Sequence, residues 1–174
     1  MRLLRINHLG IASPGLDEAV ARMARLFDLA PDHLEAVPDQ RVNTAFFPVG
    51  ESTLEFLEST DPEGPIGKFL QKRGPGIHHI CFEVDDVDAM VTHLVAQGVR
   101  MIDAQPRPGA HGCRVAFIHP AETGGVLMEL SQTWYPGSAG TPRGGARGGT
   151  SRTEGESAVP PRSCPSAVST GAHP

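Results

Sequence analysis

The amino-acid sequence predicts an α+β fold made of two similar modules, each running strand, helix and then further strands. The first observation is an internal repeat: residues 6–11 align without a gap with residues 77–82, an offset of 71 (77 minus 6). Residues 16–20 and 87–91, which follow in each copy, keep the same offset. Such a repeated unit is one supersecondary module, whose second copy completes the buried core.

The second observation is that the repeat includes residue types that bind metals and move protons. His8 of the first copy recurs as His79 in the second. Glu55 pairs with Glu129 after a slightly longer turn. Each copy thus contributes one His and one Glu, which together form a candidate four-ligand set.

The elements of the first copy follow from apolar spacing. Residues 6–11 read as a strand, and a helix follows whose apolar residues recur at helical spacing: Leu16, Val20, Met23, Ala24 and Phe27. Residues 42–49 and 53–57 have strand character, with Gly50 at the turn between them. Pro65 then lies at the start of a linker helix over residues 66–72.

The second copy begins at the Gly-Pro-Gly sequence of residues 74–76. A strand runs to Val84, and the next helix has apolar residues at helical spacing: Val87, Val91, Leu94 and Val95. Gly98 is placed as the C-terminal cap of that helix. Residues 114–119 and 125–130 are the counterparts of the two later strands of the first copy.

Strand alternation predicts which histidine of each copy faces away from the helix. In the first copy Leu9 and Ile11 share the face that packs on the helix, so His8 points to the opposite side. In the second copy His78 shares the helix-packing face, so His79 is the one that points away. We therefore expect His78 to be a partly buried structural residue.

The composition divides the chain into a domain over residues 1–135 and a tail over residues 136–174. The domain comprises module one (about 1–60), the linker helix (61–73) and module two (about 74–135). The tail is rich in Gly, Ser, Pro and Arg and has almost no large apolar residue, so we expect it to be disordered.

Charge and composition also limit the partners and the location. The tail holds four Arg and two Glu, which leaves 11 basic and 18 acidic side chains in residues 1–135, a net charge of −7 that argues against nucleic-acid binding. No membrane span and no secretory signal are apparent, so the expected location is cytoplasmic. The three cysteines have no CxxC spacing and are expected to be reduced thiols.

Two imidazoles and two carboxylates suit a borderline divalent cation and leave room for water or substrate oxygens. Any one strand His or Glu is more often solvated or hydrogen-bonded than a ligand. Glu55 and Glu129, however, both lie inside apolar strands, where a carboxylate needs a partner to offset its desolvation. The paired recurrence therefore favours a metal site.

Over residues 5–132 the chain resembles the vicinal-oxygen-chelate superfamily and, within it, the methylmalonyl-CoA epimerase family. The resemblance rests on several motifs together: Asn7-His8-Leu9-Gly10-Ile11-Ala12, Val37-Pro38-Asp39-Gln40, Leu54-Glu55-Phe56-Leu57-Glu58, the segments 65–70 and 76–84, Arg107-Pro108-Gly109-Ala110-His111-Gly112, His119-Pro120 and residues 124–130. It implies tandem βαβββ modules that form an open cupped sheet around a metal site, the glyoxalase/bleomycin-resistance-like fold.

The resemblance also implies the site. It places a divalent metal ion, cobalt or else manganese, nickel or zinc, on the family's ligand positions: His8, Glu55, His79 and Glu129. It implies an acyl-CoA substrate, a homodimer and substrate contacts from four residues: Lys68, Arg107, His111 and Arg114. Ala121 departs from the family, where Lys is frequent, so phosphate contacts must come from elsewhere in the chain. Thr44 stands where some members have Glu, proposed there as a base.

The implied reaction interconverts the 2R and 2S forms of methylmalonyl-CoA by proton abstraction and return through an enolate. Glu55 and Glu129 are the candidate catalytic residues, one for each face of the substrate. Alternatively both stay ligands, and a water or His111 moves the proton. Two other functions stay open: a glyoxalase-I-type lactoylglutathione lyase, and a non-catalytic resistance-type binding protein. An extradiol dioxygenase needs only two His and one carboxylate, so the fourth ligand argues against it.

Overall fold

The structure is a computed structural model that describes residues 1–109 and 112–133 of the chain. Its elements follow one another in this order: β1 (Leu3–Ser13), α1 (Leu16–Phe27), β2 (His33–Val37), β3 (Val42–Val49), β4 (Ser52–Ser59), α2 (Pro65–Arg73), β5 (Gly76–Val84), α3 (Val87–Ala96), β6 (Arg107–Pro108), β7 (Arg114–Ile118) and β8 (Leu127–Gln132). The predictions for His111 and for the tail over residues 136–174 lie outside the described residues.

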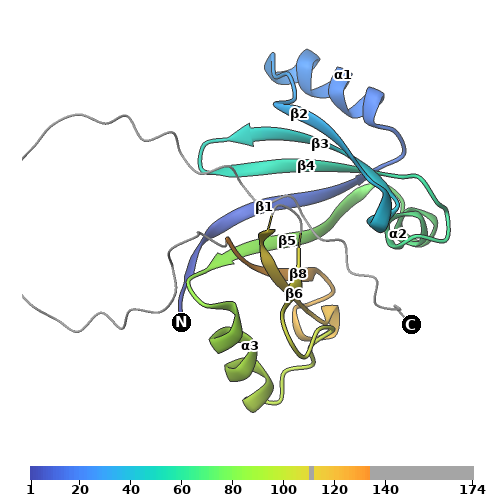
Figure 1. Cartoon of the computed structure of the whole chain (residues 1–174). Coiled ribbons are helices and arrows are strands. Elements are labelled where there is room, and N and C mark those ends of the chain that lie inside the picture. The colour runs from blue at the N-terminus through green and yellow to red at the C-terminus, as the bar shows by residue number, and fades with distance from the viewer. Residues whose placement is uncertain (110–111, 134–174) are drawn as a thin grey trace, which may run out of the picture.

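All eight strands form one sheet in the order β2-β3-β4-β1-β5-β8-β7-β6. The central strands β1 and β5 are antiparallel to each other, and each pairs in parallel with the last strand of its own module, β1 with β4 and β5 with β8. The two halves of the sheet thus have the same topology on either side of the β1–β5 boundary (Figure 1). This confirms the predicted tandem βαβββ modules and the open sheet.

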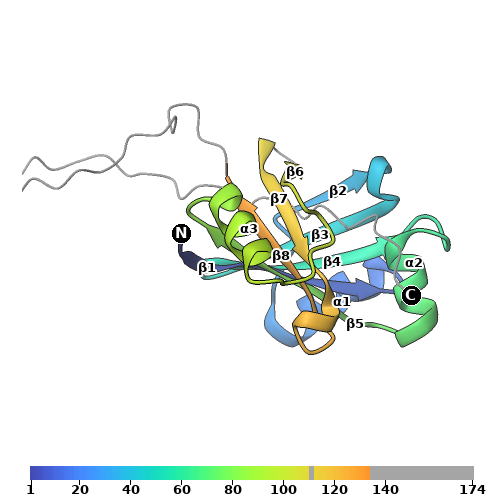
Figure 2. The same ribbon diagram turned by 90° about the horizontal axis from the view of Figure 1, so that it is seen from below.

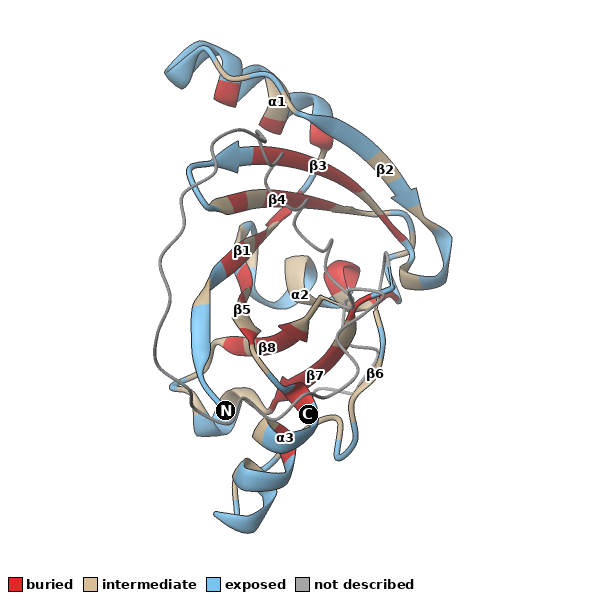
Figure 3. Cartoon of the chain, turned by 60° about the vertical axis from the view of Figure 1, so that its left-hand side comes forward, coloured by how far each residue is buried: buried red, intermediate tan, exposed pale blue. Residues whose placement is uncertain are grey.

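Helices α1 and α3 cover the outer face of the sheet, one in each module. Leu16, Ala19 and Met23 of α1 pack on Phe47 and Phe56 of β3 and β4. The equivalent cluster of the second module joins α3 to β5, β7 and β8 through six buried residues: Val84, Val87, Val91, Ala116, Ile118 and Leu130. Figure 3 shows buried residues along β3, β4, β7 and β8, whereas most of β2 is exposed.

Helix α2 lies on the other face of the sheet, at the end away from the N-terminus (Figure 2). Ile66 of α2 is buried against Ala12, Val42 and Leu57, which come from β1, β3 and β4. The helix therefore covers one end of the concave face that the helices α1 and α3 leave uncovered.

Most predicted elements agree with the observed ones to within a few residues, and the helix over residues 16–27 agrees at both ends. Gly98 does follow α3 with φ +77°, and the amide of Val99 donates to the carbonyl of Leu94, which caps the helix. The last strand begins at Leu127, not at Gly125, because Gly124 and Gly125 have positive φ and form a turn.

The sequence did not locate the edge strands β2 and β6. Strand β2 is mostly exposed and β6 has only two residues, so neither has the buried apolar face that marks a half-buried strand.

Two of the three cysteines lie within the described residues. Cys81 is a free, buried thiol, but Cys113 is disulfide-bonded, so the expectation of three reduced thiols is wrong for Cys113. Three cysteines allow one pair, and the sequence alone does not say whether or where it forms.

Among residues 1–109 and 112–133, none of the helices combines the length and apolar character needed to cross a membrane.

Candidate metal centre

The four predicted ligands lie on the four central strands of the sheet, β1, β4, β5 and β8, and all four side chains are buried. The strand register explains why they meet. Glu55 lies opposite Gly10 across the parallel β1–β4 pair, and Glu129 lies opposite Cys81 across the parallel β5–β8 pair. Gly10 and Cys81 are themselves 71 residues apart, so each module presents its carboxylate at the same place relative to its strand histidine.

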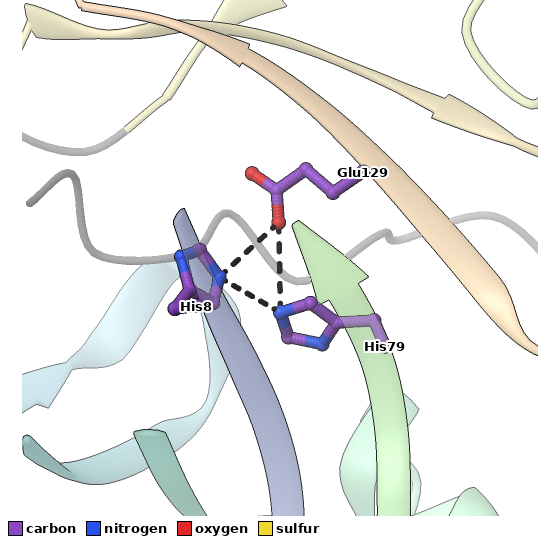
Figure 4. A group of neighbouring side chains, drawn as sticks. All are labelled: His8, His79 and Glu129. Atoms are coloured by element: carbon purple, nitrogen blue, oxygen red, sulfur yellow. Dashed lines mark hydrogen bonds and ion pairs between the residues drawn. The ribbon is translucent and has the colours of Figure 1, made fainter. Parts of the chain in front are cut away.

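The ligand atoms of the four side chains converge on one point. The Nε2 atoms of His8 and His79 are 3.1 Å apart. Glu55 Oε2 lies 3.6 Å from His8 Nε2 and 3.8 Å from His79 Nε2. Glu129 Oε2 lies 3.7 Å and 3.5 Å from the same two nitrogens. Figure 4 shows His8, His79 and Glu129 pointing toward one another from β1, β5 and β8.

Both imidazoles have the nitrogen that faces away from this point engaged by a neighbouring side chain. His8 Nδ1 lies 2.9 Å from Asn7 Oδ1, an acceptor, so Nδ1 carries the proton. His79 Nδ1 lies 3.0 Å from His78 Nδ1, and the same tautomer follows when His79 is the donor of that bond. When both rings are neutral, their Nε2 lone pairs are directed at the centre, the arrangement found in metal-binding histidines.

His78 itself is 3% exposed, so it is buried, not partly buried as expected. The reason is α2, whose Phe69 ring lies edge-on to the His78 ring at 5.0 Å between centroids. His78 therefore supports His79 from the covered end of the concave face.

Gly10 makes the position of His79 possible. A Cβ atom at Gly10 would lie 2.0 Å from Cε1 and 2.3 Å from Nδ1 of His79, far inside van der Waals contact. The imidazole thus lies directly over a backbone that has no side chain. Cys81 stands at the equivalent position of the second module, and its buried thiol donates to Ser131 Oγ.

The charges at this centre depend on burial. Burial lowers the pKa of His79 well below its usual value, and the His8 and His78 rings lower it further, so His79 is neutral. Burial also lowers the pKa of His8, but its contacts with Cys81, Glu129 and Glu55 outweigh that effect and hold the pKa well above its usual value. Burial, and then the Glu129 carboxylate, raises the pKa of the Cys81 thiol to about 11.

The donor set fits a divalent metal ion. Atoms bound at about 2.1 Å to one ion lie about 3.0 to 3.4 Å apart in tetrahedral and adjacent octahedral arrangements. The observed separations of 3.1 to 3.8 Å are close to that range. A proton on His8 can offset only one of two buried carboxylates, whereas a divalent cation offsets both. The group His8, His79 and Glu129 can hold a metal ion. Glu55, whose Oε2 lies within 4 Å of both histidine Nε2 atoms, is the predicted fourth donor.

The other predicted site residues within the described part of the chain, Arg107, Arg114 and Lys68, lie in three different environments. Arg107 of β6 lies over the ring of Phe117, on the same face of the sheet as Glu129. Arg114 instead binds Asp88 of α3 through two hydrogen bonds, on the helix-covered face. Lys68 of α2 is 64% exposed and pairs with Glu63 at 3.7 Å. Among these three, Arg107 is the one for which a contact with a neighbour of a ligand is seen, because Phe117 in turn contacts the ring of His79.

The sequence reading did not identify Asn7 and Gly10 as parts of the centre. Asn7 is fully buried, binds His8, and is itself held by Glu83, which also binds Arg5 at 2.7 Å. A polar residue directly before a candidate ligand, in an apolar strand, is a signal that could have pointed to Asn7. Gly10 carries no comparable signal, because its role depends on contact with a strand 69 residues away (79 minus 10).

Comparison with known proteins adds to this geometry. Residues 7–117 match the Glyoxalase/Bleomycin resistance protein/Dioxygenase superfamily. The chain belongs to that superfamily. The match confirms the family and the fold that the repeat and the motifs predict.

Several relatives within the superfamily are epimerases. The mitochondrial methylmalonyl-CoA epimerase of Homo sapiens is 37% identical over 129 residues, which span 74% of this chain and 73% of the relative. The ethylmalonyl-CoA/methylmalonyl-CoA epimerase of Cereibacter sphaeroides is 36% identical over 130 residues, 74% of this chain and 97% of that protein. A solved methylmalonyl-CoA epimerase in complex with methylmalonyl-CoA and NH4+ superposes with a TM-score of 0.70 at 37% identity, covering 76% of this chain and 96% of the other.

Proposed function

We propose that this chain is an epimerase that interconverts the 2R and 2S forms of methylmalonyl-CoA by metal-assisted proton abstraction and return through an enolate. The observation that carries the proposal is the convergence of four buried predicted ligands from both modules, in a chain that is similar to several methylmalonyl-CoA epimerases along most of its length. The relative solved with methylmalonyl-CoA bound supports an acyl-CoA substrate.

His8, Glu55, His79 and Glu129 would hold the divalent ion. When bound, the ion supplies positive charge beside the oxygen atoms on which the negative charge of an enolate develops. Cobalt is the metal that the family resemblance favours, and manganese, nickel and zinc suit the same donors. Asn7 and His78 keep the two imidazoles in the tautomer that such an ion needs.

Inversion at the second carbon of the substrate requires acid–base groups on both of its faces. Glu55 and Glu129 are the candidates, because they come from equivalent strands of the two modules and approach the centre from its two sides. A carboxylate that acts in this way would leave the ion. One carboxylate would accept the proton from one face, and the conjugate acid on the other face would return a proton, so that no net proton is consumed. His111 remains the alternative proton carrier and lies outside the described residues.

The expected test result is exchange of solvent deuterium into the second carbon of methylmalonyl-CoA. Chelator-treated protein in deuterium oxide should show none, and added cobalt or manganese should restore it. Glu129→Gln should lower exchange by orders of magnitude even where metal is retained, because an amide can bind a metal but cannot accept the proton. Glu18→Gln, an exposed change on α1, is the matched control.

A glyoxalase-I-type lyase is the second candidate, since it would use the same buried donor set. Metal-replete wild-type protein that exchanged no deuterium but isomerised a glutathione hemithioacetal would replace the epimerase with that function. Metal binding without either activity would favour a resistance-type binding protein.

We further propose a homodimer in the cytoplasm, both predictions from the sequence. Sedimentation of the purified chain and fractionation of the cells that express it would test them. Substrate contacts from Lys68, Arg107, His111 and Arg114 also remain predictions, of which Arg107 can be argued further.

A further inference from the structure

Arg107 is a charged, partly buried side chain on the concave face of the sheet, on which the four predicted ligands also lie. Its guanidinium carbon lies 5.4 Å from the centroid of the Phe117 ring. Phe117 in turn lies opposite Glu129 across the β7–β8 pair, and its ring is 6.5 Å from the ring of His79. One aromatic ring therefore separates the guanidinium from the metal-binding histidine.

Asp103 fixes one edge of the guanidinium and leaves the other available. Arg107 Nε donates to Asp103 Oδ1 at 3.1 Å, while Asp103 Oδ2 accepts the backbone amide of Phe117, also at 3.1 Å. Both carboxylate oxygens of Asp103 thus accept hydrogen bonds. Asp103 therefore orients the Arg107 side chain and also binds the backbone of β7. A guanidinium held in this way is a preorganised donor.

The Nη2 atom of Arg107 is buried and has no hydrogen-bond partner among the residues that the structure describes. A buried donor of a charged group that stays unpaired is costly, so native proteins normally satisfy such atoms. A guanidinium edge prefers a carboxylate or a phosphate as its acceptor.

Arg107 also breaks the symmetry between the two modules. It lies opposite Val115 on β7, and the residue at the equivalent place in module one is Glu35, which lies opposite Thr44 on β3. Val115 and Thr44 are 71 residues apart, the offset of the repeat. The two edge strands therefore place residues of opposite charge at equivalent positions of the concave face, and only module two has an arginine there.

We propose that Arg107 binds the free carboxylate of the acyl group and so makes the site specific for acyl-CoA substrates that carry one. The inference rests on the proposed function and goes beyond it, because it assigns Arg107 to the acyl end of the substrate and not to the phosphates. The reason is position: the phosphates of coenzyme A are large and strongly hydrated, whereas Arg107 Nη2 is a buried atom of a side chain that stacks on Phe117, one ring away from His79.

Equilibrium binding of three ligands to the metal-replete full chain tests this assignment. They are methylmalonyl-CoA, propionyl-CoA, which lacks the free carboxylate, and coenzyme A, which lacks the acyl group. Arg107→Met should weaken methylmalonyl-CoA binding by about tenfold or more, the effect expected of one charge-assisted hydrogen bond. Propionyl-CoA and coenzyme A should bind as they do to the wild type. Arg107→Lys should fall between the two, because lysine keeps the charge and loses the planar fork.

Arg22→Met, which replaces an exposed arginine of α1, is the control and should leave all three affinities unchanged. Equal weakening for all three ligands in Arg107→Met would assign the residue to the phosphates and overturn the proposal, as would no weakening for any of them. If Arg107→Met loses its metal, Arg107→Lys is judged by the same comparison. Failure of the epimerase function is seen separately, as absence of deuterium exchange by the wild type.

Discussion

At the scale of single residues, the centre is defined by what it costs to bury its charges. Glu55 and Glu129 are 0% and 1% exposed, and ionised carboxylates this deep are normally matched by a counter-charge or a metal. The two nearest imidazoles cannot both be protonated, because their Nε2 atoms are 3.1 Å apart. A cation between the four groups resolves both conflicts at once, which is why residue burial supports the metal more strongly than residue identity does.

The first residue-scale prediction separates the two adjacent histidines. His79→Ala should abolish stoichiometric metal in the purified protein, because it removes a donor whose Nε2 lies at the centre. His78→Ala should retain metal with some loss of stability, because His78 packs on Phe69 and binds His79 only through Nδ1. Elemental analysis of both variants decides this, and metal lost from His78→Ala but kept by His79→Ala would reverse the assignment.

The second residue-scale prediction concerns Gly10. Gly10→Ala adds one carbon atom 2.0 Å from Cε1 of His79, so the ring must move away from the centre. We expect metal affinity to fall by about tenfold or more, which corresponds to about 1.4 kcal/mol. Gly15→Ala is the matched control, because a Cβ there would meet nothing nearer than 3.6 Å. Titration with cobalt measures both variants; unchanged affinity in Gly10→Ala would show that the strand or the ring adapts without cost.

At the scale of elements, the buried strands and the amphipathic helices could be predicted because each has one face in a core. Helix α1 and strand β3 were located within a residue from apolar spacing alone. The edge strands β2 and β6 could not be located from the sequence, because they are largely exposed or very short and are strands only by pairing with a neighbour. The two residues of opposite charge at equivalent positions of the concave face, Glu35 and Arg107, lie on those edge strands.

The same limit applies to the candidate site. The four ligands could be predicted because the repeat and strand alternation are properties of the sequence itself. The residues that position these ligands could not be predicted, because Gly10 acts across the β1–β5 pair and Phe69 contacts His78 from a separate helix. Arg107 was expected among the substrate contacts, but its depth and its anchor, Asp103, follow only from the fold.

At the scale of the whole molecule, the central β1–β5 pair joins the two modules, and the ligand set lies on both sides of it. Each module alone supplies one histidine and one carboxylate, which is too few donors to enclose an ion. The metal centre can therefore form only when the modules are paired as they are here. Metal binding and the association of the two halves of the sheet should consequently stabilise each other.

The whole-molecule prediction is that metal removal lowers the stability of the entire domain and not only of the site. A ligand present at a thousand times its dissociation constant adds about 4 kcal/mol to the free energy of unfolding, provided that it does not bind the unfolded chain. For a domain of this size that corresponds to a rise in melting temperature of roughly ten degrees.

Calorimetry of chelator-treated wild-type protein, with and without added cobalt, should show one unfolding transition whose melting temperature rises as a whole. His79→Ala should show no such shift, because it lacks one of the donors shared between the modules. A wild-type melting temperature that did not respond to cobalt, manganese, nickel or zinc would show that the four buried groups are not a metal centre.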